Sequence, residues 1–378
     1  IFMKIYRFID SNSSEGQDIL NLFFITFNKY VGKADKNQAF TPDHITDFMT
    51  RLTEVTYKDR VLDACCGSGS FLVQAMVHEL ADARYGHTDA EFKELADKIK
   101  QEHIFGIENE EKAYGLSTTN MLIHGDGNSN VEFGSCFDLK NFIVGAKPNV
   151  ILMNPPYNAK PRGIPDAYKK EWTSSEKNGK SDPTKGMVFV KYLSDIAKAE
   201  KWEGTRLAVL LPMAAAIGTG TRLTKMKEEL LQDNTLDAVF SLPSEIFYPG
   251  AAVQAVCMLF TLNKPHFDHA TGKPRRKTFF GFYKDDGFIK RKGLGRVEQF
   301  DFNGHSEWKK IEKEWLNLYR NKTVKAGFSA MHAVTKDDEW LCEAYMETDY
   351  TTLTEEDFQQ TVNDYLAYLV KTGSVYEA

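Results

Sequence analysis

The sequence predicts an α/β protein built on a doubly wound, mostly parallel sheet with helices on both faces. Short apolar runs, typical of buried strands, alternate with segments of helical periodicity along the middle of the chain. A glycine-rich turn directly follows the first of these strands, as it does in doubly wound folds. The composition, with 42% apolar and 26% charged residues, is that of a globular protein and excludes wholesale disorder.

The first elements are expected to be helical. Residues 15–31 carry apolar side chains at helical spacing, and the polar segment 32–38 ends this helix. Pro42 follows Phe40 and Thr41 and suits the first turn of a short helix that ends near Leu52.

Strands and helices then alternate. The expected strands are 60–64, 104–108, 150–153, 206–212, 236–242, 253–262 and 278–283. The expected helices are 71–85, 112–123, 187–201 and 223–232. Residues 159–186 are rich in Lys, Gly, Ser and Pro, which predicts a long loop. The last 80 residues are charged and mostly helical, with Thr354 as the cap of a terminal helix.

Charge is distributed unevenly along the chain, whose formal net charge is −6. This balance argues against an autonomous, tight nucleic-acid binder. Residues 264–296 nevertheless hold ten Lys or Arg against three Asp, whereas residues 334–378 hold two basic and eleven acidic residues. Each run is either a solvated surface or a binding surface, the first for a polyanion and the second for a partner protein.

Cysteine usage and hydropathy indicate the compartment. Five cysteines, of which Cys65 and Cys66 are adjacent, form neither a disulfide framework nor a metal-ligand spacing. We therefore expect a reducing, cytoplasmic environment and no metal. No uncharged apolar run reaches the length of about 18 residues that a membrane span needs. The first residue is Ile1 rather than Met, so an N-terminal domain, either helical or a nuclease, is a candidate for a part missing from this sequence.

The glycine-rich turn is the first candidate binding site. Gly67 and Gly69 permit a tight turn after the strand at 60–64 and let backbone N–H groups approach a ligand. Glu108 ends the next strand, where an acid hydrogen-bonds a ribose in such folds. The third glycine of a dinucleotide fingerprint is absent, which favours a nucleoside ligand other than NAD. A plain strand-to-helix turn is the alternative interpretation.

A second candidate site, Asn154-Pro155-Pro156-Tyr157, directly follows the strand at 150–153. The two prolines remove two backbone donors, so local carbonyls can face a ligand. The Asn154 side-chain oxygen and a nearby carbonyl can accept two hydrogen bonds from one amino group, and Tyr157 offers a flat face for a ring. This pattern indicates a planar substrate with an exocyclic amino group, the alternative being a plain Pro-Pro turn.

These motifs together resemble a known enzyme family. The segment 63–71 is similar to the S-adenosylmethionine motif of class I methyltransferases, and Asn154-Pro155-Pro156-Tyr157 resembles the catalytic tetrapeptide of the amino-methyltransferases. Phe40-Thr41-Pro42 resembles the cofactor-binding segment that opens the γ-order DNA adenine N6-methyltransferases. The segments 207–212 and 241–247 resemble later motifs of the M subunits of type I restriction-modification systems. The order of the motifs is more specific than any one of them.

The resemblance implies a class I methyltransferase fold with a charged helical C-terminal region. We expect a division into an N-terminal helical segment and cofactor lid at 1–52, a catalytic domain at 53–296 and a helical tail at 297–378, which is either a partner-docking region or a solvated terminal helix. The residues implied to bind S-adenosylmethionine are Phe40, Thr41, Pro42, Asp63, Cys65, Cys66, Gly67, Ser68, Gly69, Glu108 and Asp138. The implied catalytic residues are Asn154, Pro155, Pro156 and Tyr157, with Phe247 as the second residue that stacks on the substrate base.

Three segments depart from the family pattern. The family often has Asp-Pro where Asp63-Ala64 stands and small residues where Cys65-Cys66 stands, a change that backbone contacts tolerate. Residues 134–138 occupy the place of a family Gly-Asp that touches the cofactor adenine, and Asp138 is the substitute there.

The implied reaction is methyl transfer to N6 of a flipped adenine in DNA, in a restriction-modification complex. Asn154 and the Pro155 carbonyl would accept hydrogens from N6, which localises its lone pair for attack. No helix-turn-helix or zinc finger appears after Asn154, so we expect a separate specificity subunit, with a restriction subunit as a further candidate partner. The alternatives are methylation of a protein glutamine or an RNA amino group, or a non-catalytic cofactor-binding assembly subunit.

Overall fold

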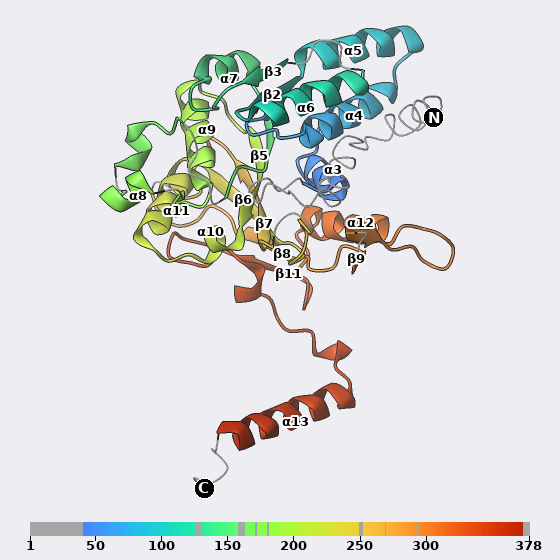
Figure 1. The fold of residues 1–378 in the computed structure, drawn as a ribbon, viewed down its shortest axis with the longest axis vertical. Helices are drawn as coiled ribbons and strands as arrows, with labels where there is room; N and C mark the ends of the chain where they lie inside the picture. The colour runs from blue at the N-terminus through green and yellow to red at the C-terminus, as the bar shows by residue number, and fades with distance from the viewer. Residues whose placement is uncertain are drawn as a thin grey trace.

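The computed structural model describes residues 41–125, 130–157, 163–170, 172–179, 181–248, 252–268, 270–292 and 295–372 (Figure 1). The helix expected at 15–31, and Phe40, lie outside these residues.

A nine-stranded sheet forms the centre of the molecule, in the order β11-β8-β6-β7-β5-β4-β1-β2-β3. All neighbouring pairs are parallel except those of β7 with β5 and β6 and that of β11 with β8. A separate antiparallel hairpin pairs β9 (Phe288–Arg291) with β10 (Gly295–Glu298). The sheet strands are β1 (Val61–Asp63), β2 (Ile104–Glu108), β3 (Asn130–Phe133), β4 (Val150–Met153), β5 (Arg206–Pro212), β6 (Thr235–Ser241), β7 (Ala255–Thr261), β8 (Thr278–Phe282) and β11 (Ser329–His332).

Helices cover both faces of the sheet (Figure 1). One face carries α3 (Asp43–Leu52), α4 (Ser70–Arg84), α5 (Asp89–Glu102), α6 (Glu111–Ile123) and α12 (Glu307–Arg320). The other carries α7 (Lys140–Ala146), α9 (Met187–Ala199), α10 (Met213–Ile217) and α11 (Thr221–Asp233). The connection after β4 holds the short η1 (Asp166–Lys169) and α8 (Ser174–Asn178), and the C-terminal region adds η2 (Cys342–Ala344), η3 (Tyr350–Thr352) and α13 (Glu355–Thr372). The doubly wound, mostly parallel architecture predicted from the sequence is confirmed.

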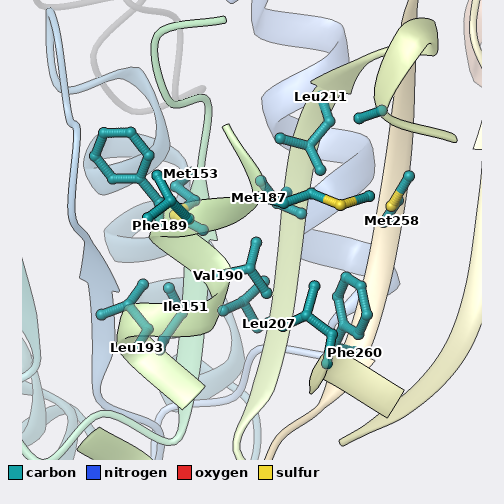
Figure 2. Packing of buried hydrophobic residues seen from close by; sticks show 14 of the residues in the cluster. Ile151, Met153, Met187, Phe189, Val190, Leu193, Leu207, Leu211, Met258 and Phe260 are labelled. Carbon is teal, nitrogen blue, oxygen red and sulfur yellow. The ribbon is translucent and has the colours of Figure 1, made fainter. Parts of the chain in front are cut away.

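Helix α9 buries its apolar face against the middle of the sheet (Figure 2). Apolar residues on adjacent turns of the helix meet the side chains of β4, β5 and β7, and each such buried side chain stabilises the fold by roughly 1.5–3 kcal/mol. The residues in this contact include Ile151, Met153, Met187, Phe189, Val190, Leu193, Leu207, Leu211, Met258 and Phe260.

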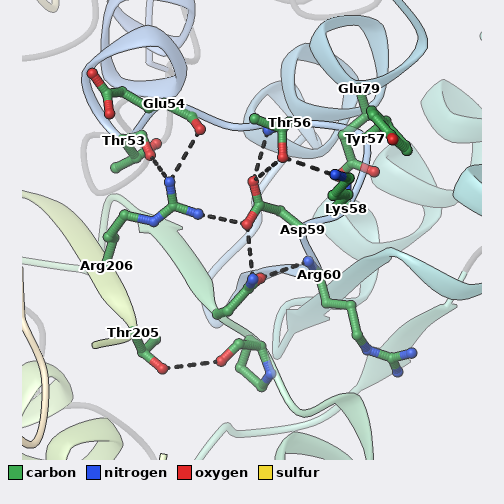
Figure 3. Close-up of polar contacts among 12 residues, drawn as sticks. Thr53, Glu54, Thr56, Tyr57, Lys58, Asp59, Arg60, Glu79, Thr205 and Arg206 are labelled. Atoms are coloured by element: carbon green, nitrogen blue, oxygen red, sulfur yellow. Dashed lines mark hydrogen bonds and ion pairs between the residues drawn. The ribbon is translucent and has the colours of Figure 1, made fainter. Parts of the chain in front are cut away.

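A polar network stabilises the edge of the sheet at which β1 and β5 begin (Figure 3). Asp59, 4% exposed, accepts hydrogen bonds from the Thr56 backbone N–H at 2.7 Å and from the Asn149 amide at 2.7 Å. Arg206 donates to Asp59 at 2.5 Å and to the carbonyls of Thr53 and Glu54 at 2.6 and 3.0 Å. The network therefore ties the end of α3 to the starts of two central strands.

Several elements differ from the sequence expectations. Helix α5 was not predicted because few of its residues are apolar, although its capping box of Thr88 and Glu91 is a local signal. Strand β3, helix α7 and the β9–β10 hairpin were also missed. The connection expected as loop at 159–186 contains η1 and α8.

The C-terminal region is divided between the body and a projection. Strand β11 extends the main sheet, and α12 packs on α3, so much of the segment from residue 297 is part of the body. Helix α13 projects away from it (Figure 1). Thr354 caps α13 as expected, through a 3.3 Å hydrogen bond from the Asp357 backbone N–H. Among the helices of the described ranges, none has the length and apolarity needed to cross a bilayer.

Candidate active site

Three candidate residues lie at one edge of the sheet because they end neighbouring parallel strands. Strand β1 lies between β2 and β4, and it pairs in parallel with both. Asp63 ends β1, Glu108 ends β2, and Asn154 follows the last residue of β4. The carboxyl ends of parallel strands are where doubly wound proteins bind ligands.

The turn after β1 is a rigid backbone loop. Gly67 and Gly69 have φ values of +54° and +86°, which side-chain-bearing residues rarely adopt. The Gly69 N–H donates to the Cys66 carbonyl at 2.7 Å, and the Cys66 N–H donates to the Ile107 carbonyl at 2.9 Å. Asn120 of α6 donates to the Ser68 carbonyl at 3.0 Å. A Cβ added at Gly67 would meet no atom of the described residues within 4 Å, so among these residues this side of the turn leaves space that a ligand can fill.

One buried carboxyl group, that of Asp63, and one half-buried carboxyl group, that of Glu108, face this turn. Glu108 accepts hydrogen bonds from the backbone N–H groups of Gly67 and Glu110, both at 2.8 Å, and burial raises its pKa. Asp63 is 1% exposed, and its Oδ1 accepts from the Cys65 N–H at 3.0 Å. Its Oδ2 accepts no hydrogen bond from the described part of the chain. Burial, together with the charge of Glu108, raises the pKa of Asp63 well above its usual range.

These residues fit a cationic nucleoside ligand. The orphaned acceptor on Asp63 calls for a donor or a positive charge, because an unsatisfied buried oxygen carries a desolvation cost. Glu108 has the two-oxygen acceptor that ribose hydroxyls need, and the loop backbone at Gly67 permits close approach. S-adenosylmethionine, with an ammonium group, a sulfonium and a ribose, matches this set.

Asn154 is oriented by a residue from a distant part of the chain. Its Nδ2 donates to the Thr41 hydroxyl at 2.9 Å, and Thr41 is 7% exposed. The bond fixes which way the amide faces, so that the amide oxygen points away from Thr41. Behind the motif, a Cβ on Gly186 would lie 2.9 Å from Leu211 Cδ2 and 3.5 Å from Pro155 Cγ, so α9 begins in close contact with the two prolines.

The two aromatic residues expected to stack on a base pack against each other. The ring centroids of Tyr157 and Phe247 are 6.1 Å apart, and the ring planes are tilted by 59°. A base between them needs two stacking contacts of about 3.5 Å each with all three rings parallel. One ring must therefore move or turn before a base can enter. The Tyr157 hydroxyl is buried without a hydrogen-bond partner in the described ranges, and burial raises its pKa.

The remaining expected residues lie around this centre. Pro42 precedes α3, and Ser68 donates to or accepts from Ser70 at 2.9 Å within the turn. Asp138 is exposed after β3, with its carboxylate close to the backbone of Gly163. The neighbouring Cys136 thiol, together with burial, raises the pKa of the Cys65 thiol, so the turn after β1 lies against the segment after β3.

One cluster beside the site was missed from the sequence. His44, in the first turn of α3, lies 2.9 Å from Asp286, and Arg296 makes two hydrogen bonds of 2.6 Å to the same carboxylate. In the sequence, Asp285-Asp286-Gly287 indicates only a turn. No local pattern predicts the pairing, because His44 and Asp286 are 242 positions apart.

Comparisons with known proteins place the chain in a family. The model of the N-6 DNA methylase family matches residues 17–367. The chain belongs to this family. The predicted membership of this family is confirmed.

The relatives are restriction-modification enzymes. The chain is 30% identical over 355 residues to the type II restriction enzyme and methyltransferase RM.BcgI of Heyndrickxia coagulans, covering 93% of this chain and 49% of that protein. It is 24% identical over 259 residues to the type I restriction enzyme EcoEI methylase subunit of Escherichia coli, covering 68% and 49%. The chain thus spans about half the length of these curated relatives.

A solved structure shares the fold. The methyltransferase subunit of a type I restriction-modification system from Streptococcus thermophilus superposes with a TM-score of 0.54 at 19% identity, covering 82% of this chain and 61% of that one. The class I methyltransferase fold expected from the motifs is confirmed.

Proposed function

We propose that this chain transfers a methyl group from S-adenosylmethionine to N6 of an adenine flipped out of DNA. The observation that carries the proposal is the Asn154 amide, held by Thr41 beside the turn that bears Asp63 and Gly67. One acceptor for an amino group and one cradle for a cationic nucleoside therefore share an edge of the sheet.

The chain's own residues bind and orient both reactants in this proposal. Glu108 holds the ribose hydroxyls, Asp63 receives the ammonium group, and the backbone of residues 65–69 wraps the methionine part. The bound cofactor supplies the electrophilic methyl group. Asn154 Oδ1 and the Pro155 carbonyl accept the two N6 hydrogens, which draws the lone pair out of conjugation and stabilises the transition state more than the ground state. Pro156 keeps the backbone of this motif extended and without a donor.

Base flipping gives the aromatic pair its role. An adenine inside a duplex cannot reach Asn154, and extrusion costs a few kcal/mol. Separation of Tyr157 and Phe247 lets the base enter, and stacking worth roughly 1–3 kcal/mol per base offsets much of that cost. Phe40 and Pro42 border the cofactor beside Thr41, and Asp138 is the expected contact for its adenine ring.

We further propose that a separate specificity subunit docks on α13 and recognises the DNA sequence. Helix α13 has no buried residue, although four apolar side chains at helical spacing are 51–60% exposed: Phe358, Val362, Tyr365 and Leu366. An apolar stripe on a projecting helix is removed from water when a partner helix packs against it, and this burial stabilises the complex. The acidic residues around the stripe favour a basic partner surface, and a restriction subunit completes the proposed complex.

The compartment follows from the substrate. DNA modification takes place where the chromosome lies, and all five cysteines are free thiols, as expected in a reducing cytoplasm. We therefore propose that the chain acts in the cytoplasm.

The test uses tritiated S-adenosylmethionine and mixed genomic DNA, with the full chain alone and with co-purified partners. We expect label on adenine N6 that Asn154→Ala abolishes and that increases with partners. Truncation before Glu355 is expected to remove the partner's effect and to leave cofactor binding intact. Cofactor binding by calorimetry without label on DNA would contradict the proposal and direct the search to protein glutamine and RNA amino groups.

A further inference from the structure

The fold separates the basic run at 264–296 into two groups on opposite edges of the sheet. Strand β8 runs parallel to β6, so it ends at the same edge as the strands that carry the candidate active site. Lys273 and Lys277 precede β8 and lie at the far edge. Lys290, Arg291 and Lys292 follow β8 on the β9–β10 hairpin and lie on the active-site side.

The hairpin touches the segment that carries the base-stacking Phe247. Lys290 Nζ donates to Glu245 at 2.7 Å, and it lies 4.2 Å from the centre of the Tyr248 ring. Glu245 and Tyr248 flank Phe247, whose ring contacts Tyr157. The cations of the hairpin are thereby held beside the place where a flipped base would enter.

The base of the hairpin is fixed to the segment that orients Asn154. Asp286, 1% exposed, accepts hydrogen bonds from Arg296 of β10 and from His44 of α3. The His44 ring also stacks on Phe288 of β9, with centroids 4.0 Å apart and planes 17° from parallel. A buried carboxylate with charge-assisted partners on both sides makes a stiff joint. The hairpin therefore stays in a fixed position relative to Thr41.

The exposed cations on this joint have the chemistry of phosphate contacts. Arg291 and Lys292 are exposed at the end of β9, in a chain whose net charge is −6. Duplex DNA carries one negative charge per about 1.7 Å of its axis, so a protein that flips a base must lie against phosphates flanking that base. An acidic chain needs local cations at that position, because its overall field repels the DNA.

We propose that the β9–β10 hairpin contacts the DNA backbone beside the flipped adenine, through Arg291 and Lys292. This inference rests on the proposed function. Lys290 holds the hairpin to the Phe247 segment, and Asp286 is a positioning residue that sets the hairpin relative to Asn154. The cations before β8 face the other edge and take no part.

The test compares two double variants that remove the same charge from the same basic run. Arg291→Gln with Lys292→Gln alters the hairpin, and Lys273→Gln with Lys277→Gln is the control at the far edge. Binding of the full chain to a fluorescent duplex is measured by anisotropy over a series of salt concentrations. Each lost phosphate contact lowers the slope of log K against log salt by about 0.9, so the hairpin variant is expected to lose about 1.8 and to bind roughly 10- to 60-fold more weakly at 0.1 M salt.

Further measurements on the same variants make the result specific. The control variant should keep the wild-type slope, and Arg291→Lys with Lys292→Arg should restore it because charge is retained. S-adenosylmethionine affinity and melting temperature should not change in any variant. Equal losses in hairpin and control variants, or no loss in either, would overturn the proposal. Methylation of DNA by the wild-type chain is measured separately. If it is absent, the proposed function is contradicted. If it is present and the hairpin variant binds DNA as the wild type does, only the hairpin contact is contradicted.

Discussion

Replacement of Thr41 by Val tests whether the orientation of Asn154 limits the reaction. Val has nearly the shape of Thr, so the substitution removes the hydroxyl, and with it the 2.9 Å hydrogen bond to Asn154 Nδ2, while the volume of the side chain is kept. One such bond contributes about 0.5–1.5 kcal/mol, and its loss lets the amide rotate away from the productive orientation. If that energy is lost from the transition state, kcat falls by about 2- to 13-fold. Asn154→Ala removes the acceptor itself, so its expected loss is larger, about 100-fold or more.

The assay is single-turnover methyl transfer with saturating cofactor and DNA, together with a separate titration of each ligand. We expect Thr41→Val to lower kcat while the affinities for S-adenosylmethionine and DNA stay within about two-fold of wild type. Thr46→Val is the matched control, because Thr46 is buried in α3 and its hydroxyl donates to the Asp43 carbonyl, away from Asn154. An unchanged kcat in Thr41→Val, or an equal loss in Thr46→Val, would refute the orienting role of Thr41.

Three other outcomes are expected. Because burial raises the pKa of Asp63 well above its usual range, a cationic cofactor should bind better to the ionised carboxylate, so affinity should increase with pH and calorimetry should show proton release on binding. Asp63→Asn should bind weakly and without this pH dependence. Asp59→Ala should lower the urea-unfolding free energy by about 2–4 kcal/mol, because Arg206 loses its ion-pair partner and the Thr56 and Asn149 donors lose a buried acceptor. The exposed Asp89→Ala should lower it by less than about 1 kcal/mol. Gly106→Ala places a Cβ 2.7 Å from a leucine methyl and should lower the free energy of unfolding by about 1–3 kcal/mol. Gly115→Ala, at a helical position where the Cβ meets no described atom within 4 Å, should raise it by about 0.5–1 kcal/mol, and equal effects of the two variants would contradict the packing argument.

The sequence alone determined the local parts of the site. Apolar runs predicted β4 and β5 at their observed bounds, because a strand buried on both faces is apolar along most of its length; in β5 only Arg206, at the start, is charged. The turn at Gly67 and Gly69 was predictable because positive φ angles favour glycine. The motif Asn154 to Tyr157 indicated its chemistry because consecutive residues supply its hydrogen-bonding groups.

Only the tertiary structure decided which distant residues meet. The contacts Thr41–Asn154, Tyr157–Phe247 and His44–Asp286 join residues separated by 113, 90 and 242 positions, and no periodicity encodes such pairs. Strand order also decided where the basic residues lie. The run at 264–296 is continuous in sequence, but β8 crosses the sheet between the two halves of the run and places them at opposite edges. Local propensity acts over a few residues, whereas strand order depends on the packing of the whole sheet, and that packing determines which cations lie beside the candidate active site.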